Sequence, residues 1–413
     1  MKRVIDQDAA VVLSGGGAYA AYEVGVMKAL FTGECNATGY NFLNPGILTG
    51  TSSGAINGSI LSSYPNTDIC TLIRYLEDIW LERISASPER CGNGVFRYRG
   101  DLLRFFDTRC FADNPLRTVN EFSRDFFFLT QSFYQHALRF LITSGSFENR
   151  VLQLIDVASF VTSEPVRTML PRIISLEGIR RSERKLRIVT TNWSRGIVRT
   201  FENSEMTDDV GFSIIQASAS LPGIFLPQDI DGDLYVDGGV LMNTPLNCAI
   251  DNGATTLHVI YMDPDVQNIP LHRLASTIEV FERFILITWA SKVNEDVDTA
   301  RWINAGLDLI ERAARNGDPP DEDLRPFIRI AARIQQRNKT DVPYKKLTVH
   351  RYHPHDDLGG GALGLLNFDR NRIASLIDRG FADAVNHDCI ASHCLLPTTP
   401  AGENGNSAAY SRG

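Results

Sequence analysis

The sequence predicts an α/β protein of three layers, α/β/α, in which helices cover both faces of a mainly parallel central sheet. Two observations predict this class. The first is a fully apolar run, Ala9–Leu13, which ends in glycines and leads into a helical pattern. Such runs are typical of strands buried in the middle of a parallel sheet. The second is the same order at Gly46–Ser59, where an apolar run, a tight turn and a helix follow one another. Consecutive strand–helix units favour a parallel sheet.

The remaining elements follow from apolar spacing and turn residues. After the first strand, apolar residues at helical spacing predict a helix with one apolar face, formed by Ala20, Val24, Met27 and Phe31 and ended by Gly33. The same reasoning predicts, in order, a helix after Ser52, an amphipathic helix at Asp68–Trp80, strands at Lys185–Asn192, Ile197–Phe201, Asp231–Val236 and Thr256–Met262, helices within His272–Asn316, a helix at Leu324–Gln336, a last strand at Lys346–Arg351 and a closing helix at Asp369–Val385.

Residues 84–183 interrupt this rhythm and predict a mostly helical insertion. Phe126-Phe127-Phe128 opens an aromatic-rich stretch, and further apolar residues then repeat at helical spacing, namely Phe133, Ala137, Phe140 and Leu141. Two interpretations stay open, a helical layer packed on the sheet and a lid or lipid-contacting surface. We expect the main domain to span residues 8–388. Residues 396–413, rich in Pro, Gly, Ser and Asn, are expected to form a disordered tail.

The bulk composition is that of an ordinary globular protein. The 413 residues are 43% hydrophobic and 22% charged, which suits one large α/β domain with insertions. A net charge of −8 argues against nucleic acid as a partner, because phosphate binding needs clustered Lys and Arg. The seven cysteines are scattered without a C-x-x-C pair, so we expect reduced, buried thiols.

The sequence shows neither a secretion signal nor a membrane span. Asp6 and Asp8 break any signal-like apolar run after Lys2-Arg3. The chain contains no apolar stretch near the ~18 residues needed to cross a bilayer. We therefore expect a cytoplasmic protein, with transient contact at membrane surfaces left open.

The segment Gly50-Thr51-Ser52-Ser53-Gly54 matches the G-x-S-x-G pattern in a strand–turn–helix context. This turn forces the central serine into a strained conformation and lifts its hydroxyl above the sheet edge. The flanking glycines remove Cβ atoms that would collide where the helix packs back on the strand. The free N–H groups of the new helix point at charge that develops beside Ser52. The alternative is an ordinary strand–helix turn that contains a serine.

Gly15, Gly16 and Gly17 follow the first strand and start a helix. Successive glycine N–H groups in this position form an anion nest, suited to a phosphate or to a catalytic oxyanion. A Rossmann fingerprint needs G-x-G-x-x-G, and Ser14–Ala20 fails at the last glycine; a P-loop needs a Gly-Lys-Ser/Thr ending, which is absent. Nucleotide binding is therefore disfavoured, and an oxyanion hole fits.

A serine hydroxyl is a poor nucleophile until a base removes its proton. Asp237-Gly238-Gly239 follows a predicted strand, and burial would raise the pKa of its carboxyl from ~3.9 toward neutral pH. A histidine could complete a triad instead; His258 lies in a predicted strand, and the candidates by chain order are His272, His350, His353, His355, His387 and His393. The stretch His353-Pro354-His355-Asp356-Asp357 is the most suggestive as a base or metal ligand set, but no other ligand pair has suitable spacing. A Ser–Asp dyad fits better, and we expect no metal and no cofactor.

Together these features resemble the patatin-like phospholipase family of lipid acyl hydrolases. The matching residues are Gly15–Gly17, Gly50–Gly54, Ala217-Ser218 with Pro222, Phe225 and Pro227, Asp237–Gly239, and the closing Leu366–Asp369 with Gly380 and Asp383-Ala384. The resemblance spans residues 8–388 in outline and leaves 84–183 unplaced. It implies a patatin-like fold and hydrolysis of fatty acyl esters of phospholipids or lysophospholipids through an acyl-enzyme, without metal or cofactor.

The resemblance also implies a role for each site residue. Ser52 would be the nucleophile, Asp237 the general base, and the amides of Gly15, Gly16 and Gly17 the oxyanion hole. One departure is Tyr19, since the family usually has Arg or Lys two residues after the glycine run. Alternatives are a carboxylesterase for short-chain non-phospholipid esters, an acyltransferase, and a catalytically silent regulatory or binding protein on the same fold. A homo-oligomer or an activating partner stays open.

Overall fold

A computed structural model describes residues 4–35, 42–87, 92–99, 115–142, 161–262, 277–316, 345–359 and 361–396. Its centre is a sheet in the order β10-β9-β1-β2-β5-β8-β7, with β6 paired to β5. The strands are β1 (Asp6–Leu13), β2 (Pro45–Thr51), β5 (Lys185–Asn192), β6 (Ile197–Glu202), β7 (Gln228–Ile230), β8 (Asp233–Asp237), β9 (Thr256–Ile260) and β10 (Thr348–Tyr352). From β10 to β5 neighbouring strands are parallel, and β6, β7 and β8 are antiparallel to theirs. The predicted mainly parallel sheet is confirmed.

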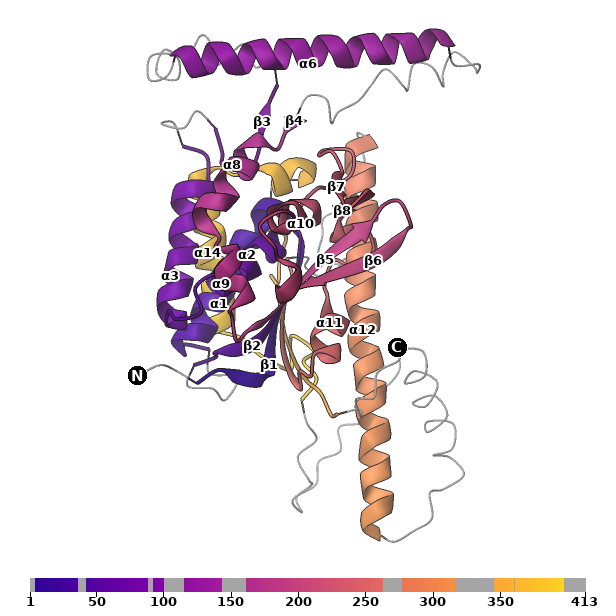
Figure 1. Ribbon diagram of the computed structural model, residues 1–413. Helices are drawn as coiled ribbons and strands as arrows, with labels where there is room; N and C mark the ends of the chain where they lie inside the picture. Colours follow the sequence, from indigo (N-terminus) through magenta and orange to yellow (C-terminus); the bar gives the residue numbers. More distant parts are fainter. Residues whose placement is uncertain are drawn as a thin grey trace.

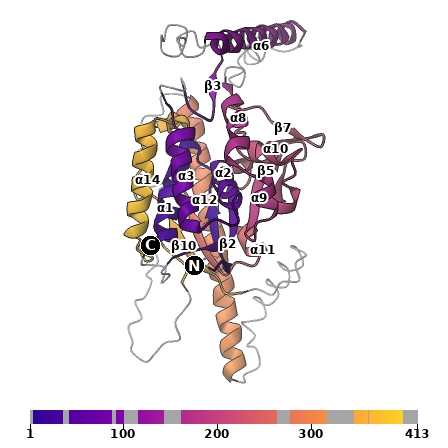
Figure 2. The same cartoon turned by 60° about the vertical axis from the view of Figure 1, so that its left-hand side comes forward.

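Helices cover both faces of this sheet, which confirms the three-layer architecture (Figures 1 and 2). Side chains alternate along β1, so that Ala9, Val11 and Leu13 pack into one core, whereas Ala10 and Val12 pack into the other. The first core is closed by α1 (Ala21–Thr32), α2 (Ser53–Ser62), α3 (Ile69–Ile79), α8 (Glu164–Ile173), α9 (Leu176–Arg180), α10 (Gly211–Ser218) and α14 (Arg370–Val385). The second is closed by α11 (Leu246–Asp251) and α12 (Thr277–Asn316).

Helix α1 corrects one prediction. The sequence predicts a single apolar face, yet Tyr22, Val26 and Leu30, which lie off that face, are also buried. The helix is sandwiched between the sheet, α3 and α14, so tertiary packing covers its whole circumference. The amphipathic pattern therefore predicts less burial of this helix than the structure has.

Several boundaries differ from the predicted ones for local reasons. Strand β8 begins at Asp233 because Asp231, at φ 55°, and Gly232 form the turn that follows β7. Asp68 is the N-cap of α3, since its side chain accepts a hydrogen bond from the amide of Cys70. Strand β7 and helix α10 were not predicted. The predicted helix at 324–336 and nearly all of the predicted tail lie outside the described residues.

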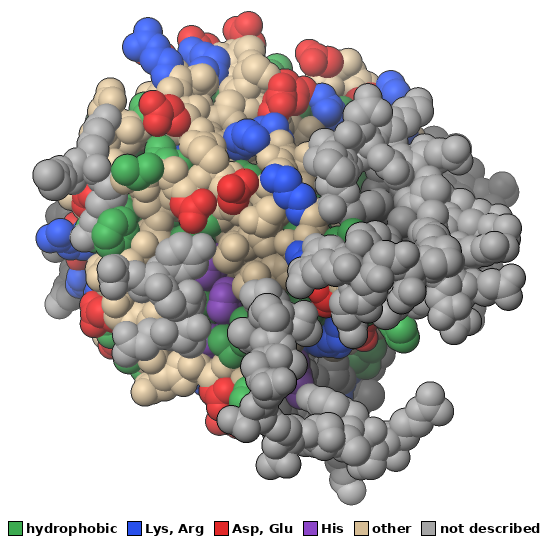
Figure 3. Space-filling model, turned by 90° about the horizontal axis from the view of Figure 1, so that it is seen from below, with side chains coloured by type: hydrophobic (Ala, Val, Ile, Leu, Met, Phe, Trp, Pro, Cys, Tyr) green, Lys and Arg blue, Asp and Glu red, His purple; other side chains and the backbone are tan. Residues whose placement is uncertain are grey.

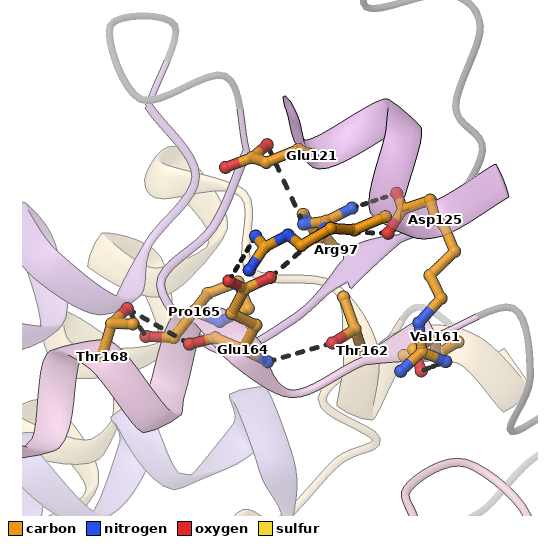
Figure 4. Close-up of polar contacts among 10 residues, drawn as sticks. Arg97, Glu121, Asp125, Val161, Thr162, Glu164, Pro165 and Thr168 are labelled. Atoms are coloured by element: carbon orange, nitrogen blue, oxygen red, sulfur yellow. Dashed lines mark hydrogen bonds and ion pairs between the residues drawn. The ribbon is translucent and has the colours of Figure 1, made fainter. Parts of the chain in front are cut away.

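The long helix α6 (Pro115–Ile142) stands apart from the rest of the domain, next to the small strands β3 (Arg97–Tyr98) and β4 (Val161–Thr162) (Figure 1). Arg97 of β3 links α6 to α8. Its guanidinium pairs with Asp125 of α6 and, at 3.1 Å, with Glu164 at the start of α8 (Figure 4). Several aromatic side chains of α6 are exposed, namely Phe126, Phe127, Phe133 and Tyr134. The boundaries predicted for this insertion and for the domain remain predictions.

Two further predictions concern membranes and cysteines. Within the described part of the chain, no helix is both long and apolar enough to cross a membrane. None of the five described cysteines forms a disulfide, and Cys35, Cys70 and Cys248 are buried. Cys91 and Cys110 lie outside the described residues.

Candidate active site

Ser52 lies at the tight turn between β2 and α2, as the G-x-S-x-G pattern predicts. Its backbone has φ 56° and ψ −125°, a region that non-glycine residues rarely adopt and that costs about 1–3 kcal/mol. Although Ser52 is the N-cap of α2, its side chain makes no capping hydrogen bond. The Ser52 side chain instead interacts with the carboxyl group of Asp237, whose pKa it lowers.

The two glycines of the pattern are required by close packing. A Cβ on Gly50 would lie 2.5 Å from the carbonyl oxygen of Gly54, and a Cβ on Gly54 would lie 2.7 Å from that of Leu13. Both distances are shorter than any real Cβ contact, so the helix could not fold back on β1 and β2 with larger residues here. The geometry of the turn thus depends on these glycines.

Ser218, at the end of α10, holds the strained turn from the other side. The amide of Ser52 donates to Ser218 Oγ at 2.9 Å, and Ser218 Oγ donates to the carbonyl oxygen of Val189 on β5 at 2.6 Å. This relay ties the turn to the neighbouring strand. In the sequence, Ser218 stands out only as one of the residues that resemble the family. No local pattern could reveal a contact between residues 166 positions apart.

Asp237 enters the site from an antiparallel strand. It pairs with Thr190 of β5, one position beyond Val189, which pairs with Thr51 of β2. The carboxylate of Asp237 accepts a hydrogen bond from the amide of Gly239 at 2.7 Å, and the residue is only 3% exposed.

Burial is the main electrostatic influence on Asp237. Desolvation raises the pKa of its carboxyl to about 7, and the hydrogen bonds from Ser52 and Gly239 limit the rise. Among the described residues, no Lys or Arg forms an ion pair with it. A carboxyl that titrates near neutral pH suits a general base.

The glycine run lies against the Ser52 turn, but its three amides are not equivalent. The amide of Gly15 donates to the carbonyl oxygen of Asn243 at 3.2 Å, and Asn243 Nδ2 donates back to the carbonyl oxygen of Gly15 at 3.1 Å. The amide of Gly16 makes a longer contact, 3.3 Å, with Ser53 Oγ. Gly17 starts the 3₁₀ turn η1 (Gly17–Ala20) at φ 57°, and no described residue accepts its amide. Sequence reasoning missed Asn243, because no local sequence pattern marks a residue that hydrogen-bonds to a loop 228 positions away.

Tyr19, the departure from the family pattern, has a structural role. Its hydroxyl donates to the carbonyl oxygen of Gly359 at 2.9 Å. The guanidinium of Arg372 on α14 lies 5.4 Å from the centre of its ring and also donates to Gly359. A positive charge from α14 is thus stacked on the residue that replaces the expected Arg or Lys.

None of the described histidines hydrogen-bonds to Ser52 or Asp237. His258 and His350 lie on β9 and β10, and their rings stack at 5.1 Å between centres. His353 stacks on Tyr261 at 4.9 Å. His272 lies outside the described residues. The described histidines therefore form no triad with Ser52 and Asp237.

A cavity of about 410 Å³ lies beside the turn that carries Asp237. Helix α12 forms one wall, and Trp289 fixes it there, because its Nε1 donates to the carbonyl oxygen of Gly239 at 2.7 Å. Partly exposed apolar side chains, Val240, Leu241 and Ile287, contribute to the lining. The cavity thus offers an apolar surface next to Gly239, two residues after Asp237.

Two comparisons relate this chain to known proteins. A family model described as patatin-like phospholipase matches residues 11–250, which include the glycine run, Ser52 and Asp237. Among solved structures, the chain is similar to VipD from Legionella pneumophila, with 16% identity and a TM-score of 0.35. The alignment covers 92% of this chain and 66% of VipD, so the chain spans just under two thirds of that protein's length.

Proposed function

The chain belongs to the patatin-like phospholipase family of lipid acyl hydrolases, and we propose that it cleaves fatty acyl esters of phospholipids or lysophospholipids with Ser52 as nucleophile and Asp237 as base. One contact carries the proposal. The side chain of a serine in a strained turn interacts with a buried carboxyl group whose pKa is about 7. Such a carboxylate is ready to accept a proton near neutral pH.

In the proposed reaction, Ser52 Oγ attacks the ester carbonyl carbon while Asp237 takes the hydroxyl proton, which gives a tetrahedral oxyanion. Collapse breaks the bond to the alcohol, and Asp237 passes its proton to that leaving group. The acyl chain remains as an ester on Ser52. Water then attacks this ester as Asp237 takes a proton from it, and return of the proton to Ser52 Oγ releases the fatty acid.

We assign the oxyanion to the amides of Gly16 and Gly17. The amide of Gly15 is already paired with Asn243, so it positions the loop. The 3.3 Å contact between Gly16 and Ser53 Oγ is long, and a charged oxyanion is the stronger acceptor. Both amides also lie at the start of η1, where helical N–H groups favour negative charge.

Substitution of Gly17 tests this assignment. In Gly17→Ala the new Cβ would lie 2.3 Å from the carbonyl oxygen of Leu365 at a left-handed φ, so the amide must move. We expect kcat to fall by about 10²–10³-fold, the usual cost of losing one oxyanion donor. Gly196→Ala is the matched control, since Gly196 has φ 67° but open space around it. Gly196→Ala should lower Tm through backbone strain alone and leave kcat unchanged. If kcat is equal in the two variants, the Gly17 amide is not a donor of the oxyanion hole.

The surface near the site favours a lipid substrate. Val240, Leu241 and Ile287 expose 41–45% of their surfaces around the cavity, and aromatic residues of α6 are exposed as well. Such apolar patches suit transient contact with aggregated lipid. The cavity beside Asp237 would receive part of an acyl chain.

Substrate aggregation separates a lipase from an esterase. Fatty-acid release from phospholipid vesicles should rise steeply above the aggregation point of the lipid, and hydrolysis of a chromogenic short-chain ester should be slower. The opposite ratio would favour a carboxylesterase. A fluorophosphonate probe should label Ser52 in either case. A folded chain that neither turns over nor takes the label would instead be a silent binding protein.

A further inference from the structure

Two thiols and two imidazoles meet at one edge of the sheet. We call His350, His387, Cys389 and Cys394 the His/Cys cluster. His350 lies on β10, the edge strand, and the other three follow the end of α14. Strands β9 and β1 separate β10 from β2, which leads into Ser52, so the cluster is distinct from the active site. Viewed from below, the molecule shows histidine side chains at its surface (Figure 3).

The cluster has the dimensions of a tetrahedral metal site. One ligand atom from each of the four side chains lies within 4.8 Å of the other three. Cys389 Sγ is 3.5 Å from His350 Nδ1, and Cys394 Sγ is 3.4 Å from His387 Nε2. For Zn–S bonds of ~2.3 Å and Zn–N bonds of ~2.0–2.1 Å, a tetrahedral angle gives an S–N separation of about 3.6 Å. These two sulfur–nitrogen distances therefore suit ligands of one tetrahedral zinc ion.

Neighbouring groups orient these ligands. His387 Nδ1 lies 3.4 Å from Ser392 Oγ, which leaves Nε2 directed at the sulfur of Cys394. The backbone amide of Arg351 donates to Cys394 Sγ at 3.3 Å. His350 is 4% exposed. Outer contacts of this kind fix the ring orientation of metal-bound histidines.

The donor set selects the ion. Two thiolates and two imidazoles form a soft S₂N₂ set, which suits zinc and does not suit calcium or magnesium. All four positions are filled by protein, as in structural rather than catalytic zinc sites. We propose that the His/Cys cluster is a structural Zn²⁺ site. The sequence predicts no metal, because the whole of α14 separates His350 from the other three ligands, and those three do not form a C-x-x-C pair.

The site would fasten the end of the chain onto the sheet. Val349 of β10 and Leu395 exchange backbone hydrogen bonds of 2.7 and 2.9 Å, so the segment after α14 covers the free edge of β10. A metal bound by the His/Cys cluster would cross-link the same two segments next to this pairing. Its binding free energy would then contribute to folding, and the covered edge would be protected from pairing with other chains.

Metal analysis of the full-length chain tests the proposal. The protein is purified without a histidine tag and under reducing conditions. Plasma mass spectrometry is expected to find one zinc ion per chain, and the protein should retain this ion in competition with a chromogenic chelator. Cys389→Ser and Cys394→Ser should lose this zinc and melt at lower temperature. Cys248→Ser and His355→Gln, which lie outside the cluster, should retain it. Ser52→Ala should also retain it, so failure of the hydrolase mechanism is distinguishable from failure of this site.

Cobalt gives a readout on the wild-type protein in case the cysteine variants do not fold. Titration of metal-depleted protein with Co²⁺ should produce tetrahedral d–d absorption and a thiolate charge-transfer band, both removed by Zn²⁺. Absence of zinc after reconstitution with excess Zn²⁺, together with absence of the cobalt bands, would overturn the proposal. So would a Cys389–Cys394 disulfide found by peptide mapping after the thiols are alkylated in the cell extract.

Discussion

Ser52→Ala is expected to abolish release of fatty acid, with kcat lower by on the order of 10⁴-fold or more, and to abolish fluorophosphonate labelling. The physical reason is that no acyl-enzyme can form without Oγ, whereas the backbone turn is preserved. Alanine keeps the Cβ at φ 56°, and the hydrogen bond from the Ser52 amide to Ser218 does not involve the lost hydroxyl. Activity should therefore fall while the fold persists.

A second substitution at the same position separates strain from chemistry. Glycine adopts φ 56° freely, so Ser52→Gly should be inactive but more stable than Ser52→Ala by about 1 kcal/mol, after its larger unfolded-state entropy is deducted. Denaturant unfolding of the two variants measures this difference. Ser62→Ala on the same helix α2 is the control for loss of a serine hydroxyl and should keep full activity, since the buried hydroxyl of Ser62 has no partner among the described residues. Full activity in Ser52→Ala would exclude Ser52 as the nucleophile.

The sequence was sufficient where chemistry is carried by consecutive residues. The apolar run before Gly15 predicted β1, and the G-x-S-x-G pattern placed Ser52 between a strand and a helix, as observed. A strand and two glycines mark Asp237 in the sequence, and the dyad of Ser52 with Asp237 stays a prediction. The structure adds that this strand is antiparallel, which brings Asp237 down to the level of Thr190 on β5.

The rest depends on contacts between distant parts of the chain. Asn243 clasps Gly15, and this leaves the three glycine amides with different roles, which no glycine pattern distinguishes. Full burial of α1 depends on α14, at the other end of the chain. The His/Cys cluster is assembled from β10 and from residues beyond α14. Short-range patterns predict elements, but they do not show which elements meet.

Asp237→Asn is expected to lower kcat by on the order of 10³–10⁴-fold, because an amide cannot take the Ser52 proton. In the wild type, a base whose pKa is about 7 predicts that kcat/KM falls about tenfold per pH unit below pH 7 and is level above it. The variant should lose this pH dependence together with its rate. Asp231→Asn is a matched control, since Asp231 lies exposed in the turn before β8. A wild-type profile that is level from pH 5 to 8 would contradict the role of Asp237.

The same substitution should stabilise the fold, and the sign follows from the raised pKa. The carboxyl of Asp237 titrates near pH 7 when folded but at its ordinary 3.8 when unfolded, so its favourable contribution is present at low pH and is lost as pH rises through 7. At pH 8 the folded protein bears the cost of a buried charge, at most about 4 kcal/mol. Asp237→Asn removes that cost and still offers an oxygen to the amide of Gly239. Unfolding by denaturant at pH 8 should therefore require a higher free energy in the variant, and the gain should shrink as pH is lowered. An unchanged or lower stability at pH 8 would show that the carboxylate is not strained by burial, and the proposed base would lose its physical basis.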